Sequence, residues 1–146
     1  MKKPNYIMQI IMTVIYLALL AGTVTACVIL YLNNTFDEFI LIFIVALVSI
    51  ICVPFPAYFV YILIKNSIGR NAAKKNKVVN GTVTAIEPLK NKSLSVFFAR
   101  LAITCGENVY YTNYLYYTNA VREFKGISVE FSVNKKIAYI KNFNLN

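Results

Sequence analysis

The chain lacks histidine and tryptophan, and it has only three cysteines and six acidic residues among its 146 residues. Zinc sites and nucleophilic triads usually depend on histidine, and the cysteines form no C-x-x-C pair. The sequence also lacks a Gly-rich phosphate loop and a G-x-S-x-G motif. After residue 64 the chain has one cysteine, Cys105, and four carboxylates, Glu87, Glu107, Glu123 and Glu130. We therefore expect no enzymatic activity, no metal site and no cofactor.

Charge is absent from two long segments, residues 7–32 and 39–64, which contain no Asp, Glu, Lys, Arg or His. Each has 26 residues, and a helix rises about 1.5 Å per residue, so either one would cross a hydrocarbon core about 30 Å thick. The sequence predicts an integral membrane protein that begins with a hairpin of two transmembrane helices, within residues 1–64. Because neither helix carries an ionisable group, the hairpin offers no proton relay and no charged substrate site.

The positive charge is distributed as in membrane proteins. The chain has 15 Lys and Arg against six acidic residues, and 12 of the 15 are lysine, which together with many Asn and Ile residues is typical of a low-GC bacterial gene. Lys2 and Lys3 precede the first apolar segment, whereas residues 33–38 carry no cation. The cations that follow the second segment are Lys65, Arg70, Lys74, Lys75 and Lys77. The positive-inside rule then places both termini in the cytoplasm, in a multi-pass protein of the cell membrane. The basic linker at residues 65–76 favours anionic lipid headgroups, and nucleic acid is the less favoured partner.

An alternative interpretation of the first segment is a lipoprotein signal peptide. Val24-Thr25-Ala26-Cys27 resembles a bacterial lipobox, in which the cysteine is lipidated. The apolar segment continues for five residues beyond Cys27, however, and it is longer than the usual signal-peptide core of about 7–15 residues. An uncleaved helix is the favoured interpretation.

Two features of the segments concern helix packing. Ala18, Gly22 and Ala26 are spaced by four residues, so they share one helix face and permit close approach of the second helix or of another copy of the chain. Pro54 and Pro56 lie inside the second segment, where proline removes a backbone donor, and they predict a kink or break near Val53. We interpret the break as a bend that fits the hairpin together, with a gate or cavity as the alternative.

Residues 77–146 predict a small all-β domain. Alternating apolar residues indicate strands over residues 78–86, 94–104, 109–118, 127–133 and 137–141, with a bulge near Ala99 and Arg100. Turns are expected at residues 105–108, 124–126 and 134–136. About five antiparallel strands in so short a chain favour a small barrel.

Three segments of this domain are "VVNGTVTAI", "ARLAITCGENVYYT" and "FKGISVEFSVNKKIAYI". In this order they resemble a family of bacterial membrane proteins that combine transmembrane helices with a small β-domain, a barrel similar to the oligonucleotide-binding-like domain of NfeD-type proteins. The matching positions are Gly81, Val83, Gly106, Tyr110 or Tyr111, Gly126, Val129, Ala138 and Ile140. The chain departs from the family at "SVNKK", where the family has a proline-containing turn. The resemblance implies a fold and brings no catalytic residues.

Tyrosine is concentrated in the third predicted strand, at Tyr110, Tyr111, Tyr114, Tyr116 and Tyr117. Strand alternation would place Tyr110, Tyr114 and Tyr116 on one face and the other two on the opposite face. Exposed tyrosines beside basic residues suit a protein partner first, then the lipid surface, then single-stranded nucleic acid. The alternative is that all five only support the sheet.

Two functions remain open from the sequence. The first is a non-catalytic, membrane-anchored binding or accessory protein whose cytoplasmic β-domain binds a protein partner. The second is a small membrane immunity protein that acts through its transmembrane hairpin. A homo-oligomer could form in either case through the Ala18, Gly22 and Ala26 face.

Overall fold

The computed structural model describes residues 4–145, so the predicted topology signal at Lys2 and Lys3 lies outside the described residues. The chain divides into two compact units. The helical unit comprises residues Ile10–Val60, and the barrel unit comprises the residues up to Gln9 together with those from Tyr61 onward. The boundary therefore runs through two helices rather than through a linker.

Three helices form the first half of the chain: α1 (Ile7–Leu32), α2 (Glu38–Cys52) and α3 (Pro54–Ala73). Helix α1 has the bounds that the sequence predicts. Asp37 caps α2, because its Oδ1 atom accepts a hydrogen bond of 2.8 Å from the Phe39 backbone N–H. Within the helical unit the Tyr16 and Phe55 rings pack with their centroids 5.3 Å apart.

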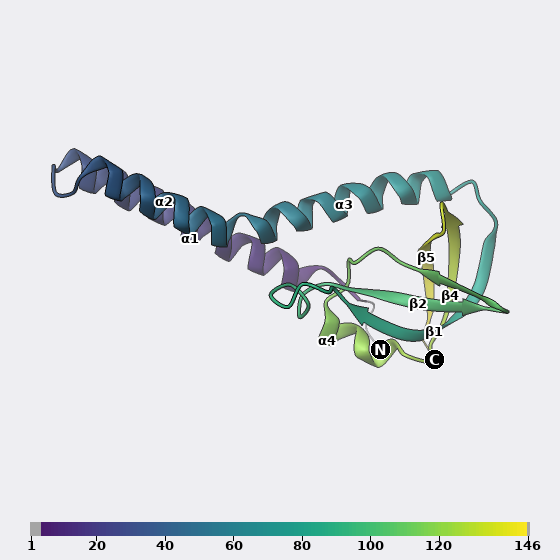
Figure 1. Ribbon diagram of the computed structural model, residues 1–146. Coiled ribbons are helices and arrows are strands. Elements are labelled where there is room, and N and C mark those ends of the chain that lie inside the picture. The colour runs from purple at the N-terminus through teal and green to yellow at the C-terminus, as the bar shows by residue number, and fades with distance from the viewer. Residues whose placement is uncertain (1–3, 146) are drawn as a thin grey trace. The chain divides into compact units, whose positions relative to one another are not determined.

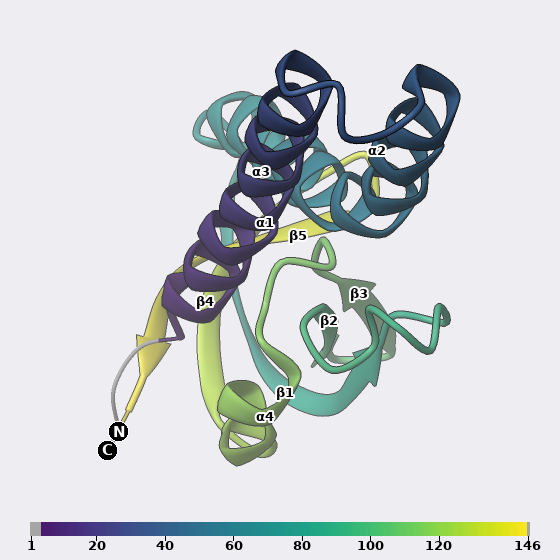
Figure 2. The ribbon, with the colours of Figure 1, turned by 90° about the vertical axis from the view of Figure 1, so that its left-hand side faces the viewer.

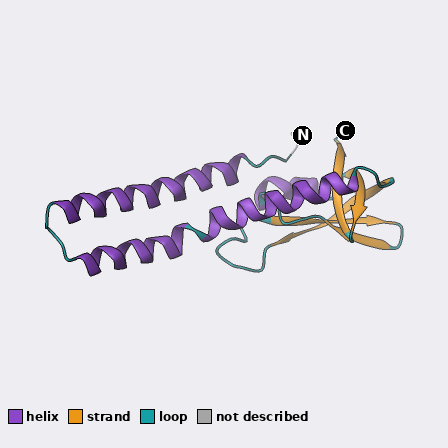
Figure 3. Ribbon diagram, turned by 90° about the horizontal axis from the view of Figure 1, so that it is seen from above, coloured by secondary structure: helices purple, strands orange, loops and turns teal. Residues whose placement is uncertain are grey.

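A bend of 41° separates α2 from α3 at Val53, immediately before Pro54 (Figure 3). Helix α1 is long and apolar enough to cross a membrane, whereas α2 and α3 meet the same requirements of length and hydropathy only if the bent pair counts as one span. The structure thus supports one candidate span, and the predicted hairpin of two spans is not confirmed. The predicted linker at residues 65–76 is mostly helical, because α3 continues to Ala73.

Five strands curl into a closed barrel in the order β1-β2-β3-β5-β4 (Figure 1). The strands are β1 (Val78–Pro88), β2 (Ala99–Cys105), β3 (Asn108–Tyr111), β4 (Ser128–Asn134) and β5 (Ile137–Asn144). The predicted small β-barrel is therefore confirmed. One neighbouring pair departs from the expected antiparallel pattern: β3 and β5 meet in parallel through Tyr111 and Ile137, and this contact closes the barrel.

The barrel interior is filled by alternate apolar side chains of β1, β2 and β4, which are fully buried. These residues are Val83, Leu101, Ile103, Val129 and Phe131. A short helix that the sequence did not predict, α4 (Thr118–Val121), and the following turn η1 (Arg122–Phe124) add Val121 and Phe124 to the same core. Figure 2 shows α4 beside β1, where it covers one end of the barrel.

Two strands are shorter than the sequence predicts, whereas β5 is longer and continues to Asn144. The strand predicted at residues 94–104 begins only at Ala99, because the N–H groups of Phe97 and Phe98 both bond to the Leu94 carbonyl and form a turn. The predicted bulge in this strand is also misplaced. The register shift lies in the partner strand, β1, between Val83 and Ala85.

The tyrosine strand predicted at residues 109–118 ends at Tyr111. Thr112 and Asn113 are buried, and the Thr112 hydroxyl accepts a 2.9 Å hydrogen bond from the Leu101 N–H and donates one of 3.1 Å to the Asn113 carbonyl. These bonds turn the chain away from the ladder. Beyond them, only Tyr116 rejoins the sheet, in an isolated bridge to Ala99.

Helix α3 lies directly on the barrel at Gly69. A Cβ atom at this position would overlap Cζ and the hydroxyl oxygen of Tyr139 in β5. Tyr139 is itself buried. The absence of a side chain at residue 69 therefore allows the helix to approach the strand closely.

Candidate functional site

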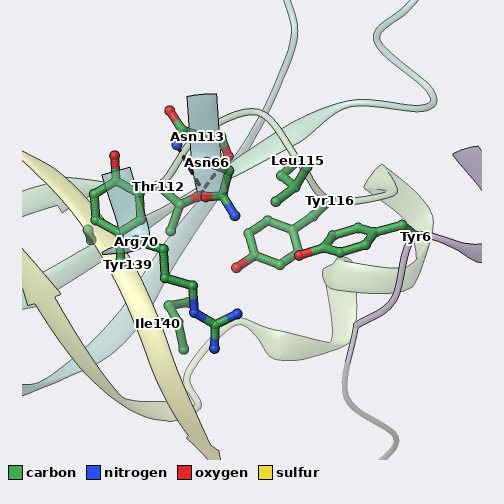
Figure 4. A pocket seen from close by; sticks show the side chains of 10 residues that line it. Tyr6, Asn66, Arg70, Thr112, Asn113, Leu115, Tyr116, Tyr139 and Ile140 are labelled. Atoms are coloured by element: carbon green, nitrogen blue, oxygen red, sulfur yellow. Dashed lines mark hydrogen bonds between the residues drawn. The ribbon is translucent and has the colours of Figure 1, made fainter. Parts of the chain in front are cut away.

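Polar side chains of four separate segments meet in a small cavity of about 30 Å³ in the barrel unit, which we name the polar chamber. The polar side chains that line it belong to Tyr6, Asn66, Arg70, Thr112, Asn113, Tyr116 and Tyr139. Asn113 donates a 3.2 Å hydrogen bond from Nδ2 to Oδ1 of Asn66 in α3 (Figure 4). The volume is about that of one water molecule, so the chamber joins segments rather than holding a substrate.

Two tyrosines of the polar chamber have perturbed acidity. Burial raises the pKa of Tyr116 above its usual value, the neighbouring Tyr6 raises it further, and Arg70 lowers it by a smaller amount. Burial also raises the pKa of Tyr6, and Arg70 again opposes the shift. Figure 4 shows the Tyr6 and Tyr116 rings and the Arg70 side chain at the chamber. Both phenols are therefore neutral at physiological pH.

The raised pKa predicts alkaline destabilisation of the barrel unit. In the unfolded chain Tyr116 ionises near pH 10.0, whereas in the folded chain it keeps its proton to higher pH. The unfolded state then binds fewer protons, so the free energy of unfolding falls as pH rises above 10, by at most about 1.4 kcal/mol per pH unit. We expect Tyr116→Phe to weaken this dependence in urea unfolding between pH 9 and 11.5. The control Tyr61→Phe removes the hydroxyl of an exposed ring and should leave this pH dependence unchanged. The same dependence of unfolding free energy on pH in both variants would contradict the prediction.

Gln9 makes a contact with the barrel unit that was not predicted from the sequence. It is the only glutamine in the chain and lies in the first turns of α1, yet its side chain is fully buried. Its Nε2 atom donates hydrogen bonds of 3.1 Å to the Phe97 carbonyl and 3.2 Å to the Leu115 carbonyl. A single amide in an otherwise apolar segment was the available signal, because a polar group there requires a partner.

The five tyrosines predicted to bind a partner have different surroundings. Tyr110 faces the core, with its ring centroid 5.6 Å from that of Phe131. Tyr116 lines the polar chamber. Tyr117 stacks on Phe97 at 6.3 Å and accepts a 3.3 Å hydrogen bond from Asn119. The predicted alternation fails after Tyr111, because the chain leaves the strand there.

Tyr111 and Tyr114 contact the same arginine, in a cluster with Glu87 that we name the Arg100 stack. The Arg100 guanidinium carbon lies 4.2 Å from the Tyr111 ring centroid and 5.0 Å from that of Tyr114. Arg100 also donates from Nε to Oε2 of Glu87 at 2.8 Å, and its Nη2 atom lies 2.6 Å from the same oxygen. The Arg100 side chain keeps 32% of its surface exposed and that of Glu87 keeps 38%, so the stack reaches solvent.

A larger cavity of about 530 Å³ lies between α3 and the β4–β5 hairpin, and we name it the α3 groove. Its lining residues are Tyr61, Ile64, Lys65, Ile68, Gly69, Ala72, Asn134, Lys135, Ile137 and Tyr139. The other basic residues predicted near the membrane lie elsewhere: Arg70 lines the polar chamber, and Lys74, Lys75 and Lys77 are exposed around the end of α3.

The residues predicted for helix packing are exposed. Ala18, Gly22 and Ala26 all lie on the exposed surface of α1, and among the described residues no atom comes within 4 Å of a Cβ built at Gly22. Cys27, the candidate lipidation position, is buried within α1, and Cys105 is half-buried. No three His, Cys, Asp or Glu side chains within residues 4–145 gather as a metal site would require.

Comparison of the chain with protein-family models, with curated proteins and with solved structures finds no match. The resemblance to NfeD-type membrane proteins therefore stays a prediction.

Proposed function

We propose that this chain is a non-catalytic, membrane-anchored binding protein whose barrel unit engages a protein partner at the cytoplasmic face of the cell membrane. The apolar helix α1 supports the anchor. The proposal includes a second span at residues 39–64, bent at Val53, so that the helices form a hairpin. The cations that follow residue 64, against none in residues 33–38, favour cytoplasmic termini.

The Arg100 stack is the observation that carries the partner proposal. Arginine and tyrosine are, together with tryptophan, the residue types enriched among the side chains that dominate binding energy at protein interfaces. Stacking between two rings holds the Arg100 guanidinium in place before binding, which lowers the entropy that a complex must lose. Tyr110 and Tyr116 make contacts inside the barrel unit, so Tyr111 and Tyr114 are the tyrosines that we expect to contact the partner.

Photo-crosslinking in intact cells tests this proposal. Val109 is 49% exposed and lies two residues before Tyr111 in β3, hence on the same face of the strand. A benzoylphenylalanine at Val109 should capture one discrete partner, and Arg100→Ala should reduce the yield about tenfold. Glu87→Gln, which keeps the two ring contacts, should reduce it less.

The control places the same crosslinker at Lys125, an exposed turn residue outside the stack. The proposal fails if both positions capture the same protein equally, or if Arg100→Ala leaves the yield at Val109 unchanged while the variant is present at the wild-type level.

A further inference from the structure

We propose that the α3 groove binds an anionic phospholipid of the bilayer, with an acyl chain on its apolar walls and the phosphate group at Lys65 and Lys135. This inference rests on the proposed membrane anchoring. It adds a lipid-binding site to the barrel unit, separate from the Arg100 stack.

The groove has apolar walls on two elements. On α3, Tyr61, Ile64, Ile68 and Ala72 recur every three or four residues and so share one helix face. Ile64 and Ile68 are 55% and 67% exposed, which leaves a continuous apolar strip uncovered. On the opposite side, Ile137 and Tyr139 of β5 form the second wall. A volume of about 530 Å³ is within the range of pockets that hold small organic ligands.

The charge at this groove has one sign. Lys65 and Lys135 belong to the lining, which contains neither Asp nor Glu. The one ion pair among the described residues joins Arg100 to Glu87, so carboxylates neutralise neither lysine. The Lys65 ammonium lies 5.8 Å from the Tyr61 ring centroid, at the boundary of the apolar wall. An apolar floor with cationic groups beside it complements a lipid that has an anionic headgroup.

The β4–β5 turn places its lysines at a cost in backbone conformation. Lys135 and Lys136 both adopt left-handed φ values, 48° and 67°, in a two-residue hairpin turn. Such turns favour Asn and Gly, because a side chain crowds the backbone at positive φ. Lysine has no conformational advantage in this turn. We therefore infer that the two lysines are present for their positive charge.

The position of the groove along the chain favours a lipid over a soluble ligand. Its α3 wall begins at Tyr61, inside the apolar segment that ends at residue 64, and continues with Lys65 and Ile68. If residues 39–64 span the bilayer, the groove begins where hydrocarbon gives way to headgroups. An acyl chain can then enter the groove without crossing water.

A photoreactive lipid tests the inference on the full-length protein. The protein is reconstituted into phosphatidylcholine vesicles that contain a few per cent of phosphatidylglycerol with a diazirine on one acyl chain. After illumination, mass spectrometry should locate lipid adducts on residues 61–72 and 137–139. The double variant Lys65→Gln/Lys135→Asn should reduce this labelling about tenfold. Asparagine is used at residue 135 because it adopts the left-handed conformation of the turn and so keeps the hairpin. The control Lys125→Gln/Lys141→Asn removes the same charge from exposed positions outside the lining and should keep the labelling.

Three results would overturn the lipid assignment: equal labelling of the two double variants, equal labelling by a diazirine phosphatidylcholine, or crosslinks from the groove to protein, which would indicate a second copy or a peptide. The same spectra report adducts on α1. Adducts on α1 without adducts in the groove contradict only the lipid site, whereas unlabelled α1 contradicts the membrane anchoring as well.

Discussion

Replacing Gly81 by alanine is expected to destabilise the barrel by about 3 kcal/mol, the upper end of the usual cost of overpacking. A Cβ atom at this position would lie 2.8 Å from the Thr104 carbonyl oxygen, 2.8 Å from Cγ2 of Ile103 and 2.9 Å from Cε1 of Phe131. The first contact is with the backbone of β2, which cannot rotate away, and the other two side chains are fully buried. The methyl group would therefore separate β1 from a neighbouring strand.

Urea unfolding of the purified protein in detergent, followed by circular dichroism, measures this effect. Gly22→Ala is the matched control, because it adds the same methyl group where no described atom lies within 4 Å. Its midpoint should stay close to that of the wild type. Equal midpoints for the two variants would show that β1 has more room than the structure indicates.

Replacing Gln9 by leucine should have the second-largest effect, a loss of about 2 kcal/mol in the free energy of unfolding. The substitution introduces an apolar side chain of similar size, so the Phe97 and Leu115 carbonyls lose the donor they share. A buried carbonyl that loses its donor, as at Leu115, costs about 1–3 kcal/mol. The same change raises the hydrophobicity of α1. The free energy of unfolding should therefore decrease in Gln9→Leu, whereas the affinity of α1 for the membrane should increase.

The control for this variant is Thr23→Val in the same helix. The Thr23 hydroxyl bonds to the Leu19 carbonyl of its own helix at 2.9 Å, so its removal should change the free energy of unfolding by less than about 0.5 kcal/mol. Protease protection of the loop at residues 94–98 gives a second measurement. It should decrease in Gln9→Leu and stay unchanged in Thr23→Val; equal protection in both would mean that Gln9 does not hold this loop.

Local sequence signals predicted α1 and the barrel well. Helix α1 has the same bounds as the predicted segment of 26 residues without charged side chains. Period-two alternation in residues 127–133 corresponds to β4, and Gly106 and Gly126 take positive φ in predicted turns. These features depend on neighbours in sequence, which is why they could be predicted.

The candidate sites were predicted less completely, because they depend on contacts between distant segments. The tyrosine-rich segment was singled out as a candidate binding site, but alternation assigned the faces of its side chains wrongly, because Thr112 and Asn113 bend the chain. Arg100 is 11 and 14 residues from the two rings it contacts, and no local pattern joins them. The α3 groove combines residues 61–72 with residues 134–139, so it depends on the packing of α3 against β5, where Gly69 lies close to Tyr139.

The sequence alone determined the lack of histidine, the two uncharged apolar segments and the alternation of apolar residues in the barrel strands, since composition and periodicity are properties of the chain itself. Tertiary structure decided which side chains became neighbours. It buried the side-chain amide of Gln9, which donates hydrogen bonds to two backbone carbonyls. It also placed the five tyrosines in different surroundings, in the core, at the polar chamber and at the surface, and it placed an apolar strip of α3 beside two lysines. The physical reason is that burial and charge pairing depend on distances in space, which strand closure sets and sequence spacing does not.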